Sequence, residues 1–194
     1  LGETLSMLRF WYTLLSYCIQ PLILLFMWKK SLKQPNYRKR LSERYGIYPH
    51  FTKPTPNGVI VHAASVGEVI AATPLIKAIQ VRYPKLPITI TTVTPTGSAR
   101  VNDAFGESVS HFYLPYDLPD AINRFIDFVQ PKLMIVIETE LWPNLIARFH
   151  QRNIPFIVAN ARLSPRSAKR YGWIKRALKG TWQRTNMILA QDKV

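Results

Sequence analysis

Cysteine and acidic residues are scarce in this chain of 194 residues. The single cysteine, Cys18, rules out an intramolecular disulfide framework and leaves no metal site built on cysteines. Only 11 Asp and Glu residues stand against 26 Lys and Arg, which gives a formal charge of +15. Hydrophobic residues make up 47% of the chain and charged residues 19%, as in a folded domain. The positive charge must therefore belong to particular segments of a globular protein.

Two common phosphate-binding motifs are also absent. No G-x-G-x-x-G follows the first predicted strand, which argues against an NAD-dependent enzyme, and no Walker A motif occurs. His62, His111 and His150 are single and scattered, so we interpret each as a structural histidine. The sequence predicts a protein with no cofactor and no metal site.

The charge is concentrated at the two ends of the chain. Residues 1–50 hold 8 basic and 2 acidic residues, and residues 161–194 hold 9 and 1. Residues 51–160 hold 9 and 8, and are nearly neutral. A nucleic-acid module would spread basic and aromatic residues across the fold, so we expect no nucleic-acid partner. Charge that flanks a neutral core favours a membrane surface or a phosphorylated partner.

A long apolar run lies near the N-terminus. Leu8 to Trp28 is interrupted only by Arg9, Gln20 and Pro21, and about 20 residues are enough to cross a bilayer. Aromatic residues at both ends and a basic cluster after the run predict a membrane-anchor helix over residues 7–28, with the rest of the chain cytoplasmic. Gln20 and Pro21 leave a helix lying in the membrane interface as the alternative. The basic cluster comprises Lys29, Lys30, Lys33, Arg38, Lys39, Arg40 and Arg44.

Residues 29–57 are predicted to connect this anchor to a folded domain over residues 58–194. Tyr37–Tyr45 is interpreted as a short basic helix. Gly46–Gly58 contains three prolines, which is typical of a linker.

From Val59 onward, short apolar runs alternate with helical patterns. We predict strands at residues 59–61, 88–93, 111–114, 133–137, 156–159 and 187–190. We predict helices near residues 68–83, 96–105, 118–129, 141–152 and 168–184. Apolar strands between helices indicate a parallel sheet covered on both faces. The fold class is therefore α/β, doubly wound and Rossmann-like.

Glu68 lies where the first strand passes into its helix. Ser65-Val66-Gly67-Glu68 fits the S-x-x-E capping box, in which the glutamate only satisfies a backbone amide. The functional alternative places a ligand against Gly67 and the free amides of the helix start, with Glu68 as a base beside it. Pro74 indicates either a kink in this helix or a new start capped by Thr73.

Further polar groups follow the other strands, at the edge where α/β sheets bind ligands. Thr94-Pro95-Thr96-Gly97-Ser98 is either a turn with an N-cap or part of a site. Glu138 and Glu140 are harder to explain as helix-dipole charges alone. Asn160 and Arg162 open a basic stretch that is either a solvated face or a phosphate site.

Five motifs, taken in order, resemble the bacterial 3-deoxy-D-manno-octulosonic acid (Kdo) transferases of lipopolysaccharide synthesis. The resemblance extends from about Met7 to the end of the chain. The motifs are H-A-A-S-V-G-E (62–68), T-V-T-P-T-G-S (92–98), Y-L-P-Y-D (113–117), E-T-E-L-W-P-N (138–144) and N-A-R-L-S (160–164).

The resemblance implies the N-terminal, acceptor-binding half of a GT-B glycosyltransferase at the inner membrane. It implies that Glu68 is the general base and that Glu138 is also catalytic. Kdo would pass from CMP-Kdo, held by a C-terminal half, to a lipid A precursor (lipid IVA) with inversion. The candidate substrate-binding residues are Ser65, Gly67, Thr96, Gly97, Ser98, Glu140, Asn160 and Arg162. The alternative is a non-enzymatic, membrane-anchored α/β module that binds an anionic lipid or protein.

Overall fold

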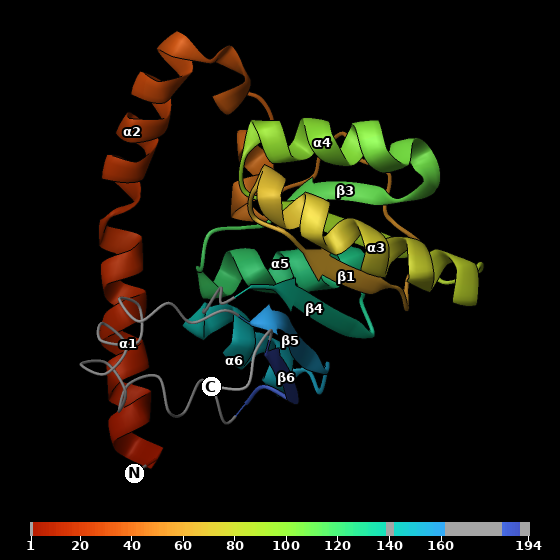
Figure 1. Cartoon of the computed structure of the whole chain (residues 1–194). Helices are drawn as coiled ribbons and strands as arrows, with labels where there is room; N and C mark the ends of the chain where they lie inside the picture. Colours follow the sequence, from red (N-terminus) through yellow and green to blue (C-terminus); the bar gives the residue numbers. More distant parts are fainter. Residues whose placement is uncertain (1, 139–141, 162–183, 191–194) are drawn as a thin grey trace.

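A six-stranded parallel sheet forms the centre of the structure (Figure 1). The computed structural model describes residues 2–138, 142–161 and 184–190. All six predicted strands are confirmed, each to within two residues at its ends. The strands are β1 (Val59–His62), β2 (Ile88–Thr92), β3 (Ser110–Tyr113), β4 (Leu133–Ile137), β5 (Phe156–Ala161) and β6 (Met187–Ala190).

The strand order is β3-β2-β1-β4-β5-β6, and every neighbouring pair is parallel. The chain builds outward from β1 to β3 and then returns to the other side of β1 at β4. Between β1 and β4, Val59 pairs with Leu133 and His62 with Val136. This reversal is a topological switch point, where open α/β sheets bind ligands at the carboxyl ends of the strands. The predicted α/β class is confirmed, and the strand order is that of a Rossmann-like fold.

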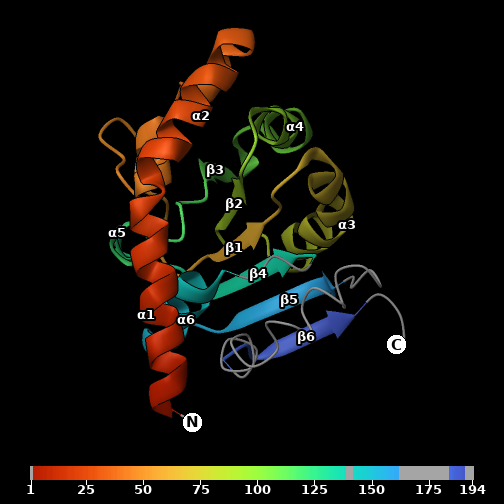
Figure 2. The same cartoon turned by 90° about the vertical axis from the view of Figure 1, so that its left-hand side faces the viewer.

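Helices cover both faces of the sheet, as Figure 2 shows. Because successive strand residues point to opposite faces, Val61 belongs to one buried cluster and Ile60 to the other. Burial on both faces explains why the inner strands β1 and β4 are unbroken apolar runs, whereas β6, at the edge of the sheet, is exposed. The predicted helix at residues 168–184 lies outside the described residues, except for its last position. The first face carries α3 (Val66–Arg82) and α4 (Pro95–Phe105), and the second carries α5 (Pro119–Val129) and α6 (Pro143–Gln151).

Proline marks the start of three of these helices, where a missing N–H costs nothing. Pro74 is different, because it lies inside α3. The helix runs through it without a new start. The Thr73 hydroxyl donates to the Val69 carbonyl at 2.8 Å instead of capping a following turn. The alternative of a second helix beginning at Thr73 is therefore wrong.

The predicted basic helix over Tyr37–Tyr45 is also wrong. The chain forms two 3-10 segments instead, η1 (Pro35–Tyr37) and η2 (Leu41–Tyr45). Between them Arg40 has a left-handed backbone, with φ of 59°. A left-handed residue cannot continue a right-handed helix, and it turns η2 toward the end of β3.

The segment that follows η2 has no helix or strand, as predicted for residues 46–58, but it contributes to the core. The Tyr48 ring stacks on Phe128 of α5 with centroids 4.2 Å apart. It also meets the edge of Phe112 of β3 at 5.5 Å. This predicted linker therefore supplies an aromatic side chain to the second buried cluster.

The apolar N-terminal run forms two helices rather than the predicted single one. They are α1 (Gly2–Cys18) and α2 (Gln20–Lys33). Pro21 explains the break, because it has no N–H to donate to Tyr17 and its ring crowds that carbonyl. Among the described residues no single helix is long and apolar enough to cross a membrane. Met7–Cys18 and Gln20–Lys33, bent by 45°, meet the requirements of length and composition only as a pair.

Candidate functional site

Glu68 is held at the N-terminus of α3, directly after β1. Its carboxylate accepts hydrogen bonds from the Ala64 amide at 2.7 Å and from the Ser65 hydroxyl at 2.8 Å. The Ser65 oxygen in turn accepts from the Glu68 amide at 3.4 Å. This is capping-box geometry, with the Ala64 amide bound in place of the Ser65 amide. The Glu68 side chain is therefore held in one position at the switch point. A fixed position is compatible both with a helix cap and with a general base.

Gly67 leaves open space beside this carboxylate. Among the residues that the structure describes, a methyl group added there would meet only the Ser65 hydroxyl oxygen within 4 Å, at 3.9 Å. The residue is exposed in the first turn of α3, where backbone amides have no partner inside the helix. A ligand group can approach the backbone here without displacing a side chain.

The Thr94–Ser98 segment caps α4, and only part of it faces outward. The Thr94 hydroxyl accepts from the Gly97 amide at 3.1 Å, as an N-cap does. Gly97 and Ser98 are buried, whereas Thr96 is exposed. A side chain at position 97 would come within 3.0 Å of the Thr94 hydroxyl. Gly97 and Ser98 are therefore buried in this structure and Thr96 is exposed, and substrate binding by these three residues stays a prediction.

Glu138 and Asn160 lie side by side at the ends of β4 and β5. The Glu138 amide donates to the Ala159 carbonyl at 2.9 Å, which continues the ladder between the two strands. Both residues have a left-handed backbone, with φ of 65° at Glu138 and 56° at Asn160. Asn tolerates this conformation, but for Glu it costs about 1 to 3 kcal/mol, and such strain gathers at functional sites. The other two predicted ligands of this edge, Glu140 and Arg162, lie outside the described residues.

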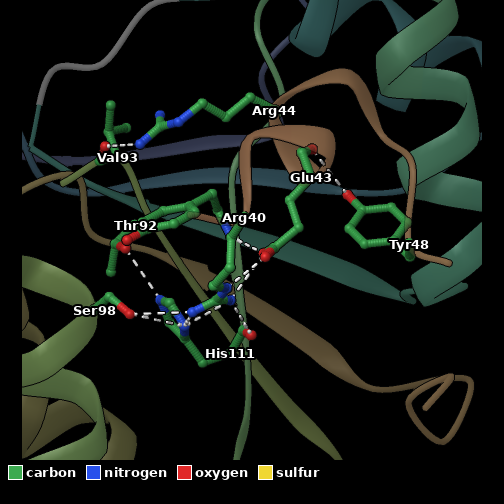
Figure 3. A network of polar contacts seen from close by, with 9 residues as sticks. Arg40, Glu43, Arg44, Tyr48, Thr92, Val93, Ser98 and His111 are labelled. Carbon is green, nitrogen blue, oxygen red and sulfur yellow. Dashed lines mark hydrogen bonds and ion pairs between the residues drawn. The ribbon is translucent and has the colours of Figure 1, made fainter. Parts of the chain in front are cut away.

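A network that the sequence did not predict lies beside this edge (Figure 3). Its centre is Glu43, whose side chain is fully buried. The Glu43 carboxylate pairs with the Arg40 guanidinium through two bonds, one of them 2.8 Å long, and accepts from the Tyr113 amide at 2.9 Å. The network ties η2 to the carboxyl end of β3.

Arg40 extends the network to the start of α4. Its guanidinium donates to the His111 carbonyl at 3.0 Å and to the Ser98 hydroxyl at 3.2 Å. The His111 ring nitrogen Nδ1 lies 3.2 Å from the same guanidinium and must accept, so Nε2 donates to the Thr92 hydroxyl at 3.0 Å. Burial, and then the charge of Arg40, lower the pKa of His111 to about 3. His111 is therefore a neutral structural residue.

Arg44 turns inward in the same way. Its guanidinium donates to the Val93 carbonyl at 2.7 Å and lies over the Tyr113 ring, 4.4 Å from the centroid. Only 3% of the residue is exposed. Arg40 and Arg44 of the predicted basic cluster therefore contact the domain and hold the fold together. Its other members, at positions 29, 30, 33, 38 and 39, are exposed.

His62 is the second buried histidine near the site. Its Nδ1 lies 2.9 Å from the Thr91 hydroxyl, and burial lowers its pKa to about 4. Within residues 2–138, 142–161 and 184–190, no three His, Cys, Asp or Glu side chains gather where they could hold a metal ion.

Asp117, the last residue of the Y-L-P-Y-D motif, caps α6 from a neighbouring loop. Its carboxylate accepts from the Asn144 amide at 3.0 Å and from the Leu145 amide at 2.8 Å. The Tyr12 hydroxyl of α1 bonds the same carboxylate. Burial raises the pKa of Asp117 to about 6, against the opposing effect of these hydrogen bonds. No sequence pattern predicted that one carboxylate would join α1, the β3–α5 loop and α6.

These features define a doubly wound α/β domain with a carboxylate and a helix N-terminus at its switch point, where open α/β sheets bind ligands. The protein-family model described as 3-deoxy-D-manno-octulosonic-acid transferase (kdotransferase) matches residues 39–194, and the chain belongs to this family. The 3-deoxy-D-manno-octulosonic acid transferase of Haemophilus influenzae is 60% identical over 97% of this chain. That of Bordetella pertussis is 33% identical over 93%, and a probable mitochondrial one of Arabidopsis thaliana is 35% identical over 82%. The chain spans 44%, 43% and 36% of these relatives, less than half of each.

Proposed function

We propose that the complete protein containing this chain transfers Kdo from CMP-Kdo to a lipid A precursor. In this proposal the described domain is the acceptor-binding half of a GT-B enzyme, and a second Rossmann-like half binds the nucleotide. The observation that carries the proposal is Glu68, fixed beside the open Gly67 turn at the switch point of a chain that belongs to this family.

Glu68 would act as the general base. It would take the proton from a sugar hydroxyl of the acceptor while that oxygen bonds to the anomeric carbon of Kdo from the side opposite CMP. The bond between Kdo and the phosphate then breaks, and its electron pair leaves with CMP, so the anomeric configuration inverts. Glu138, exposed at the end of β4, would stabilise the positive charge that develops on the sugar. The proposal needs no metal, because the second half would bind the phosphate of the nucleotide.

The outward residues of the site would contact the acceptor. Thr96, Gly67 and Asn160 have positions suited to this role. The exposed basic residues at positions 29, 30, 33, 38 and 39 would bind the acceptor's phosphates and an anionic leaflet, together with the basic residues in the sequence of 161–184. We therefore propose a location at the inner membrane, with the α/β domain on the cytoplasmic side.

A transfer assay tests the proposal directly. The complete protein in detergent, given CMP-Kdo and lipid IVA, is expected to release CMP and to yield lipid IVA that is heavier by one or more Kdo residues. Mass spectrometry of the lipid and chromatography of CMP measure the two products. Lipid binding without transfer would contradict the proposal and favour the non-enzymatic membrane module.

Gly67→Ala is expected to lower kcat/KM for transfer by at least tenfold while the fold is kept. The new methyl group has room in the free protein, and alanine stabilises a helix by up to about 1 kcal/mol relative to glycine. It would, however, occupy the space through which the acceptor approaches the backbone, and a displacement of about 1 Å can cost about 100-fold in rate. Thermal unfolding and steady-state kinetics of the same sample separate the two effects.

Gly97→Ala is the matched control for this variant. Its methyl group would press against the Thr94 hydroxyl and Thr92 in a buried turn, so a loss of stability is expected first. If Gly67→Ala retained full activity, the open turn would have no part in binding the acceptor.

A further inference from the structure

The polar side of the α1–α2 pair faces the α/β domain, and its apolar side is exposed. The less exposed positions recur every three or four residues, as one face of a helix does. Those of α1 and the start of α2 are mostly polar. Figures 1 and 2 show the pair standing along the outside of the domain. The positions of this inner stripe are Arg9, Tyr12, Thr13, Ser16, Gln20, Ile23, Met27 and Ser31.

Polar contacts hold α1 and the start of α2 to the domain. Besides the bond between Tyr12 and Asp117, the Thr13 hydroxyl donates to the Asn144 side chain at 3.0 Å. The other two contacts are Tyr17 hydroxyl to Asp120 and Tyr45 hydroxyl to the Gln20 side chain. All four fall between residues 12 and 20, in the middle of the apolar run.

The outer side of the pair is a continuous apolar surface. Leu22 is 66% exposed, Phe10 62% and Trp11 58%. Monomeric soluble proteins rarely expose apolar patches of more than a few hundred Å². Exposed basic residues at positions 29, 30, 33, 38 and 39 follow directly. Apart from Tyr17, whose hydroxyl contacts Asp120, the exposed apolar side chains of the pair are Met7, Leu8, Phe10, Trp11, Leu14, Leu15, Ile19, Leu22, Leu24, Leu25, Phe26, Trp28 and Leu32.

We propose that α1 and α2 lie parallel to the membrane in one anionic leaflet, with the outer side in the acyl chains and the α/β domain held against the inner stripe. Charge favours a leaflet over a second copy of this chain, because the basic residues at the end of α2 would repel their own copies and attract anionic headgroups. The inference deepens the membrane location of the proposed function.

The contacts also favour the parallel orientation over a spanning one. Residues 7–33 of the pair are about 40 Å long at 1.5 Å per residue, so length alone would permit a crossing. A crossing would place residues 12–20 near the bilayer centre, together with Asp117, Asp120 and Asn144. A charged group there costs several kcal/mol. In the parallel orientation these groups remain on the water side.

Cys18 lies in the middle of the run and is exposed, so it is a natural position for a depth probe. Three single-cysteine proteins are labelled with NBD. One carries the label at Cys18, and the other two carry it at Leu8→Cys or Leu25→Cys together with Cys18→Ser. Any cysteine outside residues 1–194 is replaced by serine in all three. The complete protein is then bound to phosphatidylethanolamine–phosphatidylglycerol vesicles. Lipids carrying a quencher at a shallow or a deep acyl position measure the depth of each label.

The parallel orientation predicts three equal, shallow depths, about 5 to 10 Å below the headgroups. A label at position 18 near the bilayer centre, with shallow labels at 8 and 25, would overturn the inference in favour of a spanning pair. The inference would equally be wrong if no label met either quencher, or if the labels were shielded by dimerisation without lipid. If the protein transferred Kdo but the label at position 18 lay deep, only this inference would be refuted. If the protein were inactive but the three labels lay at equal depths, only the proposed function would be refuted.

Leu22→Asp and Val81→Asp form a matched pair for the same surface. Both side chains are strongly exposed, Val81 at 81%, but Val81 lies on α3, across the sheet from α1. Leu22→Asp is expected to weaken binding to the anionic vesicles at least tenfold, because a charge replaces an inserted apolar group. Val81→Asp should leave binding unchanged. Equal effects of the two changes would contradict the assignment of this surface.

Discussion

Glu43→Ala is expected to lower the free energy of unfolding by about 3 to 5 kcal/mol, the usual cost of removing one partner from a buried ion pair. The alanine leaves the Arg40 guanidinium and the Tyr113 amide without the carboxylate that binds both of them. In a chain of this size, about 2 to 4 °C of melting temperature is lost per kcal/mol, so the midpoint should fall by roughly 6 to 20 °C. Calorimetry or denaturant unfolding measures the change.

Two variants test whether the buried network is the cause. Asp127→Ala breaks the ion pair between Asp127 and Arg152, in which the Asp127 side chain is 59% exposed and the Arg152 side chain 45%. This change should lower the free energy of unfolding by less than about 1 kcal/mol. Glu43→Gln keeps an oxygen for the Tyr113 amide and should cost less than Glu43→Ala. A loss at Glu43 as small as that at Asp127 would mean that η2 does not stabilise the end of β3.

The network also shows where sequence reasoning fails. The residues at positions 29–44 form one basic cluster in the sequence, and nothing local distinguishes Arg40 and Arg44 from the lysines before them. The distinction comes from partners about 50 to 70 positions away: the Val93 carbonyl for Arg44, the Ser98 hydroxyl for Arg40, and the Tyr113 ring for both. A tertiary contact of this kind leaves no periodic signal.

The sheet was predictable for the opposite reason. The inner strands β1 and β4 are short apolar runs buried on both faces, and the helices between the strands force parallel connections. The strand order needed the structure, because a run of buried strands does not reveal which neighbour each one takes. That order makes β1 and β4 neighbours, so the segments that carry Glu68 and Glu138 leave the sheet at the same edge.

At Glu68 the sequence left a cap and a base as alternatives, and the structure has the capping contacts. The hydrogen bonds that cap α3 also fix the carboxylate beside the open Gly67 turn. A general base must be held in this way, so the two roles are compatible. Only a change that keeps the cap and removes the basicity separates them.

Glu68→Gln makes that change, and it is expected to lower kcat for Kdo transfer by about 10² to 10⁴, the contribution typical of a general base. The amide oxygen can still accept from the Ala64 amide, and the amide nitrogen can donate to the Ser65 hydroxyl, which then acts as acceptor. The cost in stability should therefore stay near 1 kcal/mol or below. Kinetics in detergent with CMP-Kdo and lipid IVA measure the first quantity, and thermal unfolding the second.

Glu107→Gln is the matched control, because Glu107 is exposed in η3 (Gly106–Ser108), before β3 and away from the carboxyl edge. It should leave both quantities unchanged. If Glu68 were only a cap, Glu68→Gln would behave like this control, and Glu68→Ala would lose stability without a comparable loss of kcat in the folded fraction. A large fall in kcat for Glu68→Gln, at nearly unchanged melting temperature and acceptor binding, would leave proton transfer as the step that the carboxylate performs.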